Sequence, residues 1–185
     1  MIIKEHEIEL KNGKKALLRS PGDDLVEELI DYLRTSSGET EFLIRYPDEF
    51  GDLTHEAEKK IIDAKRASDS EAMIVATVDG KVAGCCSISW STRFKLRHRA
   101  SVAIALLRDY WGLGLGTRLL EELIRIAEED GQILQLELDF IEGNSRARAL
   151  YEKLGFRITG VKPNAARLRD GRMLNEYSMI REIKR

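Results

Sequence analysis

The sequence predicts an α/β or α+β domain built on one mixed, mostly antiparallel central sheet flanked by helices. Three observations predict it: helical periodicity in the first third, two strand-like runs joined by Asp79-Gly80, and alternating strand and helix patterns in the last half. With 185 residues, 43% of them hydrophobic, the chain can bury one substantial core. We therefore expect a single domain over residues 1–185, with a variable helical region at 1–70 and a core at 71–183.

Charge and hydropathy exclude several classes of protein. The chain has 30 Lys and Arg against 32 Asp and Glu, which lacks the basic excess that duplex binding requires. Its apolar runs are far shorter than the roughly 20 residues that cross a bilayer, and the N-terminus reaches Lys4 and Glu5 without a signal-peptide core. We expect a cytoplasmic protein with no nucleic-acid or membrane partner.

The cysteines and histidines do not form a metal-binding pattern. Cys85 and Cys86 are adjacent, so on a strand they point to opposite faces and act as packing residues. The three histidines are scattered along the chain. We therefore expect no metal site.

Two helices are expected in the first 70 residues. The first begins at Asp23 or Asp24 and ends between Thr35 and Gly38, and the second spans Thr54 to Ala67 with Thr54 as its N-cap. A loop over Glu39 to Asp52, which carries three aromatic residues, joins them. The apolar faces are Leu25, Val26, Leu29, Ile30 and Leu33 in the first helix, and Ala57, Ile61, Ile62 and Ala64 in the second.

Three strands are expected next. Ala72 to Val78 and Lys81 to Trp90 read as a hairpin, because Asp79-Gly80 favours the positive φ angles of a type I′ turn. Arg99 to Leu107 is a third, apolar strand.

The strongest helical pattern covers Thr117 to Glu129. Its apolar stripe is Leu119, Leu120, Leu123, Ile124 and Ala127. Glu121 and Arg125 are spaced to pair at i,i+4, and Gly131 ends the helix.

The last 50 residues continue the alternation. Ile133 to Phe140 reads as a strand with one apolar face, Asn144 to Lys153 as a short helix stopped by Gly155, and Phe156 to Ile183 as one or two strands around Arg169-Asp170-Gly171. The apolar face of the first strand is Leu134, Leu136, Leu138 and Phe140, opposite Gln135, Glu137 and Asp139.

The glycine-rich turn between a strand and the strongest helix carries the most chemical information. Gly112, Gly114 and Gly116 let a ligand approach the backbone, and the N–H groups at a helix start favour a phosphate. No lysine follows Gly116 as a nucleoside-triphosphate loop requires, and the spacing does not match the dinucleotide fingerprint. A tight connection without a ligand is the alternative.

Two motifs in the correct order resemble the GCN5-related N-acetyltransferase (GNAT) family. The glycine turn resembles its acetyl-coenzyme A loop, (Q/R)xxGx(G/A), and the run from Asn144 to Phe156 resembles its NxxAxxLYxxxGF block. The resemblance covers about Ala72 to Met179 and implies the GNAT-like acyl-CoA N-acyltransferase fold. Trp111 stands at the Q/R position, so pyrophosphate binding is expected to rest on the backbone.

The resemblance implies roles for individual residues. It makes 1–70 the acceptor-side region and 71–183 the cofactor-binding core. It assigns acetyl-CoA binding to Ile104, Ala105, Leu106, Gly112, Leu113, Gly114, Leu115, Gly116, Thr117, Asn144 and Tyr151. Tyr151 is the implied general acid that protonates the leaving thiolate, with a packing role as its alternative. Asn144 is also a good helix N-cap.

The general base is less determined. Asp139, on the polar side of its strand, is the first candidate, and Glu137, His98 or an ordered water are the others. Arg45, in the loop between the first two helices, is a candidate for binding a carboxylate of the acceptor.

The predicted activity is direct transfer of an acetyl group from acetyl-CoA to a primary amine, with an amino acid or another small amine as acceptor. A protein N-terminus or lysine is the alternative acceptor, because one fold serves many substrates. A rival of another class is a sensor that binds acyl-CoA without turnover, which the release of free thiol would distinguish. A homodimer is possible, since dimers are common among the relatives that the chain resembles.

Overall fold

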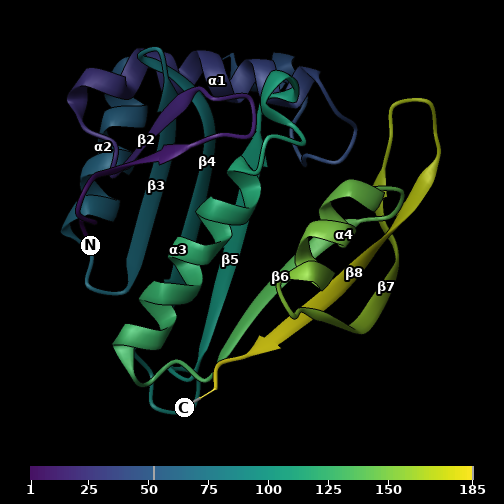
Figure 1. The fold of residues 1–185 in the computed structure, drawn as a ribbon. Helices are drawn as coiled ribbons and strands as arrows, with labels where there is room; N and C mark the ends of the chain where they lie inside the picture. The colour runs from purple at the N-terminus through teal and green to yellow at the C-terminus, as the bar shows by residue number, and fades with distance from the viewer. Residues whose placement is uncertain (52, 185) are drawn as a thin grey trace.

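The computed structural model describes residues 1–51 and 53–184, and these form one eight-stranded sheet with helices on both faces (Figure 1). The strand order is β1-β2-β3-β4-β5-β6-β8-β7, and every neighbouring pair is antiparallel except β5–β6. The strands are β1 His6–Glu9, β2 Lys15–Arg19, β3 Glu71–Val78, β4 Lys81–Trp90, β5 Arg99–Leu106, β6 Gln135–Ile141, β7 Arg157–Arg167 and β8 Met173–Glu182. The α-helices are α1 Val26–Gly38, α2 His55–Ala67, α3 Leu115–Asp130 and α4 Ser145–Lys153, and the 3₁₀ helices are η1 Asp23–Leu25, η2 Pro47–Phe50 and η3 Arg108–Tyr110. The predicted mixed, mostly antiparallel sheet is confirmed.

A β-hairpin that was not predicted from the sequence precedes the helices. β1 and β2 pair at the edge of the sheet, and β2 continues the ladder onto β3 (Figure 1). The turn between them contains Asn12-Gly13, with Gly13 at φ +80. Asn-Gly is a strong hairpin signal, so this element was predictable from the sequence.

The first two helices lie where they were expected, but the face of α2 was wrongly predicted. Thr54 caps α2 through a bond from the backbone N–H of Ala57 at 3.2 Å, as expected. Ala57, Ile61 and Ala64 are nevertheless exposed, whereas Glu58 and Ile62 are buried. The helix is rotated because only the side of Ile62 meets the second core beneath α1.

The central hairpin and the strand after it are confirmed. β3 and β4 join through Asp79 at φ 51 and Gly80 at φ 80, the positive angles that a type I′ turn requires. β5 then pairs with β4 along most of its length.

Helix α3 begins at Leu115, two residues before the expected start, and ends before Gly131 at φ 71. Its predicted apolar stripe is buried. The expected Glu121–Arg125 pair does not form: Arg125 instead contacts Glu122 at 2.9 Å and Glu129 at 2.7 Å. In this position the guanidinium forms ion pairs with two carboxylates, whereas the expected pair would have supplied one.

The last elements follow the prediction with one shift. β6 begins at Gln135, so Leu134 lies before the strand and is 42% exposed, whereas Leu136, Leu138 and Phe140 are buried. The final stretch forms two strands, β7 and β8, joined by a turn with Gly171 at φ 91.

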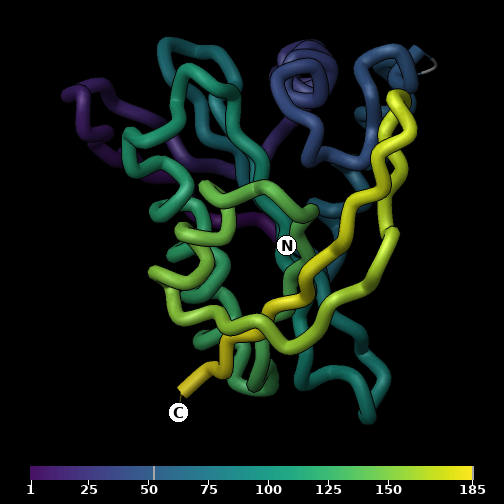
Figure 2. The backbone as a smooth tube through the Cα atoms, turned by 90° about the vertical axis from the view of Figure 1, so that its right-hand side faces the viewer, coloured from purple at the N-terminus to yellow at the C-terminus, as the bar shows by residue number. Residues whose placement is uncertain are grey.

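Two apolar cores lie on opposite faces of the sheet. The larger core lies between the sheet and α3 and α4, and the smaller lies beneath α1 and α2 (Figures 1 and 2). Cys86 packs in the first and Cys85 against the second, which confirms that the two cysteines face opposite sides. Within the described part of the chain, no helix has the length and apolar character needed to cross a membrane.

Candidate active site

Strands β5 and β6 are paired only at their beginnings. The parallel ladder ends at Ser101 opposite Glu137, after which the strands separate (Figure 1). At the far end of β5, the backbone N–H of Leu107 donates to the carbonyl of Ala83 on the β4 side. Because main-chain groups alternate between neighbours in an antiparallel ladder, those of Ile104 and Leu106 face the gap. The separated strands therefore present unpaired main chain to a ligand.

A cleft of about 270 Å³ occupies this region. It is lined by Thr40, Phe42, Leu43, Ile104, Ala105, Leu106, Trp111, Gly143, Asn144, Ser145, Arg146, Ala147, Leu150 and Tyr151. The structure thus brings the predicted β5 segment together with the two predicted residues of the α4 motif. The carbonyl of Ala105 is already bonded, since it accepts from the Tyr32 hydroxyl at 2.7 Å.

The glycine turn between β5 and α3 exposes consecutive backbone donors. Gly112 at φ 77 and Gly114 at φ 89 adopt left-handed conformations, and α3 begins at Leu115. Among the described residues, no acceptor bonds the N–H groups of positions 112 to 117. Six free donors beside the positive end of a 16-residue helix form an anion site.

Gly116 is required by packing rather than by its φ angle. A Cβ atom there would lie 3.0 Å from the Leu150 side chain and 3.2 Å from that of Leu106. The start of α3 therefore sits directly against the cleft.

Two arginines lie over the ring of Trp111. Its indole N–H donates to the Leu106 carbonyl at 3.0 Å, and the guanidinium groups of Arg146 and Arg108 lie 4.7 and 5.5 Å from the ring centroid. This stack places positive charge beside the turn, although the Q/R side chain of the family motif is absent.

Two lysines that the sequence analysis did not single out also approach the turn. Lys153 Nζ is 3.5 Å from Thr117 Oγ1, and Lys11 donates its backbone N–H to Leu113 O at 3.1 Å. The Lys11 side chain also passes over Gly114, 3.9 Å from where a Cβ would stand. The N-terminal hairpin brings Lys11 there, and this contact could not be predicted as long as the hairpin itself was missed.

Tyr151 is buried on the α4 side of the cleft. Its ring centroid lies 6.1 Å from those of Phe140 and Phe156, and burial raises the pKa of its phenol to about 12. No group in the described structure forms a hydrogen bond with the hydroxyl, which lines the cleft. The side chain thus packs as a core residue while its proton stays available for donation.

Asn144 performs the predicted capping role. Its Oδ1 accepts from the Ala147 backbone N–H at 3.1 Å. Since Asn144 also lines the cleft, it fixes the start of α4 beside the ligand space.

Asp139 lies on the face of β6 opposite the one against which Tyr151 of α4 packs. It is exposed, and its Oδ1 accepts from the Ser178 hydroxyl at 2.6 Å. Among the described side chains, no cation lies within ion-pair distance of it, whereas Glu137 pairs with Arg99 at 3.0 Å and accepts from Gln135 at 2.6 Å. Of the two candidate carboxylates, Asp139 is therefore the one free to bind a substrate ammonium.

Two further candidates are not brought to the cleft. His98 is exposed at the opposite end of β5, six residues before Ile104, a separation of about 20 Å along a strand. The guanidinium of Arg45 lies 5.4 Å above the Phe50 ring, and its side chain does not line the cleft.

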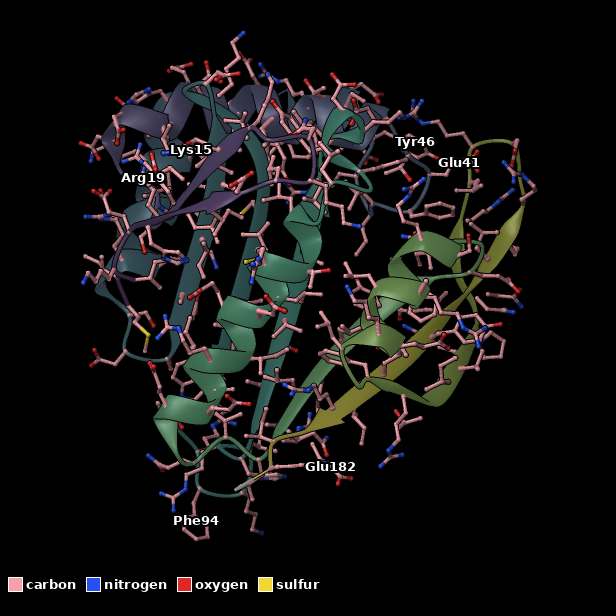
Figure 3. All side chains as sticks on the ribbon, in the orientation of Figure 1. Lys15, Arg19, Glu41, Tyr46, Phe94 and Glu182 are labelled. Atoms are coloured by element: carbon pink, nitrogen blue, oxygen red, sulfur yellow. The ribbon has the colours of Figure 1, made fainter. Side chains whose placement is uncertain are left out.

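The segment at residues 39–50 bridges the two halves of the molecule. Figure 2 shows it beside the turn between β7 and β8, and Figure 3 shows Glu41 and Tyr46 at this position. Arg169 pairs with Asp48 at 2.7 Å and lies 4.1 Å above the Tyr46 ring, while Arg172 pairs with Glu41 at 2.7 Å. These contacts hold the roof of the cleft, which Phe42 completes by packing on Gly143.

The cysteines are unsuited to nucleophilic catalysis. Burial raises the pKa of the Cys85 thiol to about 12 and that of Cys86 well above its ordinary value. Neither residue lines the cleft.

Comparison with known proteins places these features in a family. The model of the Acetyltransferase (GNAT) family matches residues 38–156. L-amino acid N-acetyltransferase AaaT of Escherichia coli (strain K12) is 30% identical over 108 residues, 58% of this chain and 66% of that protein. The chain therefore spans just under two thirds of the length of this curated relative.

Solved structures agree with this match. The acetyltransferase of the GNAT family from Streptococcus pneumoniae superposes with a TM-score of 0.84 at 31% identity, covering 91% of this chain and 99% of that one. The yncA acetyltransferase from Salmonella typhimurium, solved with its cofactor acetyl-CoA, superposes at 0.76 with 18% identity, covering 91% and 94%. At 18% identity, the similarity to the Salmonella typhimurium structure shows a shared fold alone.

Proposed function

This chain belongs to the GNAT family of acetyltransferases, and on that premise we propose that it moves the acetyl group of acetyl-CoA to a primary amine. The observation that carries the proposal is the cleft itself. It opens beside unpaired main chain at the end of β5, and it is bounded by Trp111, the residue that precedes the glycine turn with its six free N–H groups. A ligand with a peptide-like arm and a pyrophosphate matches both parts.

The cleft residues would hold acetyl-CoA in two ways. The free N–H groups of residues 112–117, assisted by Arg108 and Arg146, suit the pyrophosphate. The outward main chain of Ile104 and Leu106 suits the amide groups of the pantetheine arm, although the Leu106 carbonyl is shared with Trp111. Acetyl-CoA supplies the thioester from which the acetyl group is transferred.

The protein's own groups then account for transfer without a covalent enzyme intermediate. Asp139 accepts a proton from the substrate ammonium, directly or through water, and the neutral amine attacks the thioester carbonyl. Backbone N–H groups at the end of β5 stabilise the developing oxyanion. Tyr151, protonated at neutral pH because its pKa is raised to about 12, donates its proton to the departing thiolate. The nitrogen, positively charged after the attack, then releases its second proton to water or to the Tyr151 phenolate, which restores the phenol.

For the acceptor we propose an amino acid or another small amine as the first candidate, with a protein N-terminus or lysine as the alternative. The named activity of the Escherichia coli relative supports an α-amino group as the nucleophile. A sensor without turnover is the rival, and its sequence support was Trp111. The two arginines over that indole supply positive charge at the turn, so the substitution does not argue against cofactor binding.

The test is calorimetric titration of the protein with acetyl-CoA, followed in the same sample by thiol release with a panel of amines. Binding together with amine-dependent release supports the transferase. Binding without release on any amine supports the sensor. Absence of binding contradicts the whole assignment, because the glycine turn would then hold no pyrophosphate.

A cytoplasmic location and a homodimer stay predictions from the sequence. Size-exclusion chromatography with light scattering measures the molar mass and so tests the homodimer.

A further inference from the structure

A polar groove runs along the face of the sheet that α1 and α2 leave uncovered. Two hollows of about 410 and 370 Å³ share Ser101 and Glu137, so they are continuous. We call them together the sheet-face groove. Its lining residues are Glu71, Ser89, Trp90, Ser91, Leu96, Arg99, Ser101, Gln135, Glu137, Leu138, Asp139, Thr159, Ser178, Met179 and Ile180.

The groove is negative at the end next to the cleft. Asp139 lies two residues beyond the last β5–β6 pair, where the strands separate. The other groove carboxylates have cationic partners, since Glu71 pairs with Lys65 at 3.1 Å and Glu137 with Arg99 at 3.0 Å. Asp139 therefore gives this end an uncompensated negative charge.

Positive charge lies beyond the opposite end of the groove, outside its lining. The loop between β4 and β5 carries Arg93, Lys95 and Arg97, which are exposed and form no ion pair with any described residue. Phe94, 77% exposed, projects from this loop at the bottom of Figure 3, with the Arg97 guanidinium 4.4 Å above its ring. Leu96 connects the loop to the groove, which it lines.

Carboxylates near this loop offset part of its charge. Asp69 and Asp130 line the hollow on the other side of the loop together with Arg97. Asp130 accepts from the backbone N–H groups of Gln132 and Ile133, both at 3.1 Å. Arg93 and Lys95 form no ion pair with a described residue, so the loop retains an excess of positive charge.

The separation of the two ends matches an extended peptide. In the β5–β6 ladder Arg99 lies opposite Gln135, which is four residues before Asp139. Four residues of a strand span about 13 Å. The basic loop lies beyond that point. A free amino acid occupies only the Asp139 end, whereas an extended chain places about its fifth residue at Arg99.

We infer that the acceptor is the N-terminus of a peptide or protein that carries acidic side chains at about its fifth to seventh positions. The α-ammonium lies at Asp139, the first residues lie along the hydroxyl-lined floor, and the acidic residues meet Arg93, Lys95 and Arg97. This inference rests on the proposed transferase function and narrows its acceptor.

The experiment measures thiol release with synthetic heptapeptides that share their first four residues. Positions five to seven are Glu, Gln or Arg, and a tripeptide of the common start serves as reference. We expect kcat/KM to be roughly tenfold higher for the Glu peptide than for the Arg peptide, mainly through KM, and the difference to shrink at high salt.

A charge-reversal variant tests the loop itself. In Arg93→Glu, Lys95→Glu, Arg97→Glu the preference is expected to invert, while the rate with the tripeptide stays unchanged and shows that the protein is folded. The matched control makes the same charge change away from the groove, at exposed cations without ion pairs: Lys4→Glu, Lys60→Glu, Lys81→Glu. It is expected to keep the preference for acidic peptides.

The outcomes separate the two proposals. Equal rates on the three heptapeptides, or a preference that survives loop reversal, overturns the inference and leaves the transferase function intact. Acetylation of free amino acids but not of peptides does the same and indicates a small acceptor. Acetyl-CoA binding with no thiol release on any amine contradicts the transferase function itself.

Discussion

The two sides of the β5–β6 separation differ in construction. The side that faces α3 and α4 is apolar and closed, with Tyr151 buried and the turn at residues 112–117 held against Leu150 and Leu106. The opposite side is an exposed polar sheet face around Asp139. The buried side suits a ligand that every turnover requires, and the open side suits a nucleophile that arrives and leaves.

The difference also explains how the two proposed catalytic groups keep separate roles. Burial disfavours the phenolate, so Tyr151 remains a proton donor. Exposure lets Asp139 stay in contact with water and with an incoming ammonium. Strand β6 thus lies between the proposed acid and the proposed base.

The largest expected effect is on the buried side. Gly114→Val would force a branched residue into φ +89 and displace the N–H groups of the turn. We expect the Kd for acetyl-CoA to rise on the order of 10³-fold, because two or more hydrogen bonds to charged oxygens would be lost. Calorimetric titration measures it.

A matched control for that change is Gly131→Val, at the other end of α3. Gly131 has φ +71, and a Cβ there would meet nothing within 4 Å. It imposes similar backbone strain far from the turn, so affinity for acetyl-CoA should be retained. Equal losses in both variants would point to general destabilisation rather than a cofactor site.

The next effect is on the open side. Asp139→Asn keeps an oxygen that can accept from Ser178 but removes the proton acceptor. We expect kcat/KM at pH 7 to fall several hundredfold, with partial recovery at high pH where the free amine is abundant. Glu137→Gln, on the same face but already paired with Arg99, is the control and should lose little. Similar losses in the two variants would remove Asp139 from the base role.

Tyr151→Phe is expected to lower kcat about 100-fold while acetyl-CoA affinity changes little, since the ring contacts with Phe140 and Phe156 remain. Because the pKa of Tyr151 is about 12, the wild-type hydroxyl stays protonated from pH 6 to 10. The wild-type profile should therefore show no loss of the acid in that range. Unchanged turnover in the variant would leave Tyr151 with a packing role alone.

The smallest expected effect is on the free energy of unfolding, through a buried carboxyl group on α2. Glu58 on α2 is 3% exposed, forms no side-chain hydrogen bond or ion pair with a described residue, and has its pKa raised by burial. A carboxyl whose pKa is raised on folding stabilises the native state relatively at low pH, and this benefit is lost as pH rises through the folded pKa. Glu58→Gln should thus raise the free energy of unfolding by about 1 kcal/mol at pH 8 and leave it unchanged at pH 4.

Thermal unfolding at the two pH values measures this difference. Glu56→Gln, on the exposed side of the same helix, is the control and should shift neither value. A destabilised Glu58→Gln at pH 8 would mean that the carboxylate has a partner in solution.

Local sequence patterns predicted most elements but not their orientation. The Asp79-Gly80 turn and the cap at Thr54 came directly from residue type, because dihedral preference and capping are local. The buried face of α2 could not be predicted in this way, because Ala57 and Ile62 belong to two overlapping rows of apolar residues and only the row of Ile62 is buried. Only packing against α1 and β3 decides which stripe is buried.

The candidate site shows the same division. The two motifs predicted that the glycine turn and α4 share a ligand. In the structure α4 lines the cleft and the turn lies next to it, with Trp111 in the lining and Gly116 packed against Leu150 and Leu106. Lys11 and Lys153 reach the turn from elements distant in sequence, and no periodicity indicates that contact. Likewise, His98 and Asp139 were both plausible bases until the fold placed them at opposite ends of the strands.

By itself, the sequence determined the family, the order of most elements and the backbone donors of the turn, since each depends on residue type and spacing along a short stretch of chain. The tertiary structure decided which carboxylate stays unpaired, which cations surround Trp111, and that one face of the sheet remains open from Asp139 to the basic loop. These features depend on the register of strands and the packing of helices. Such contacts join residues far apart in sequence, and no local pattern records them.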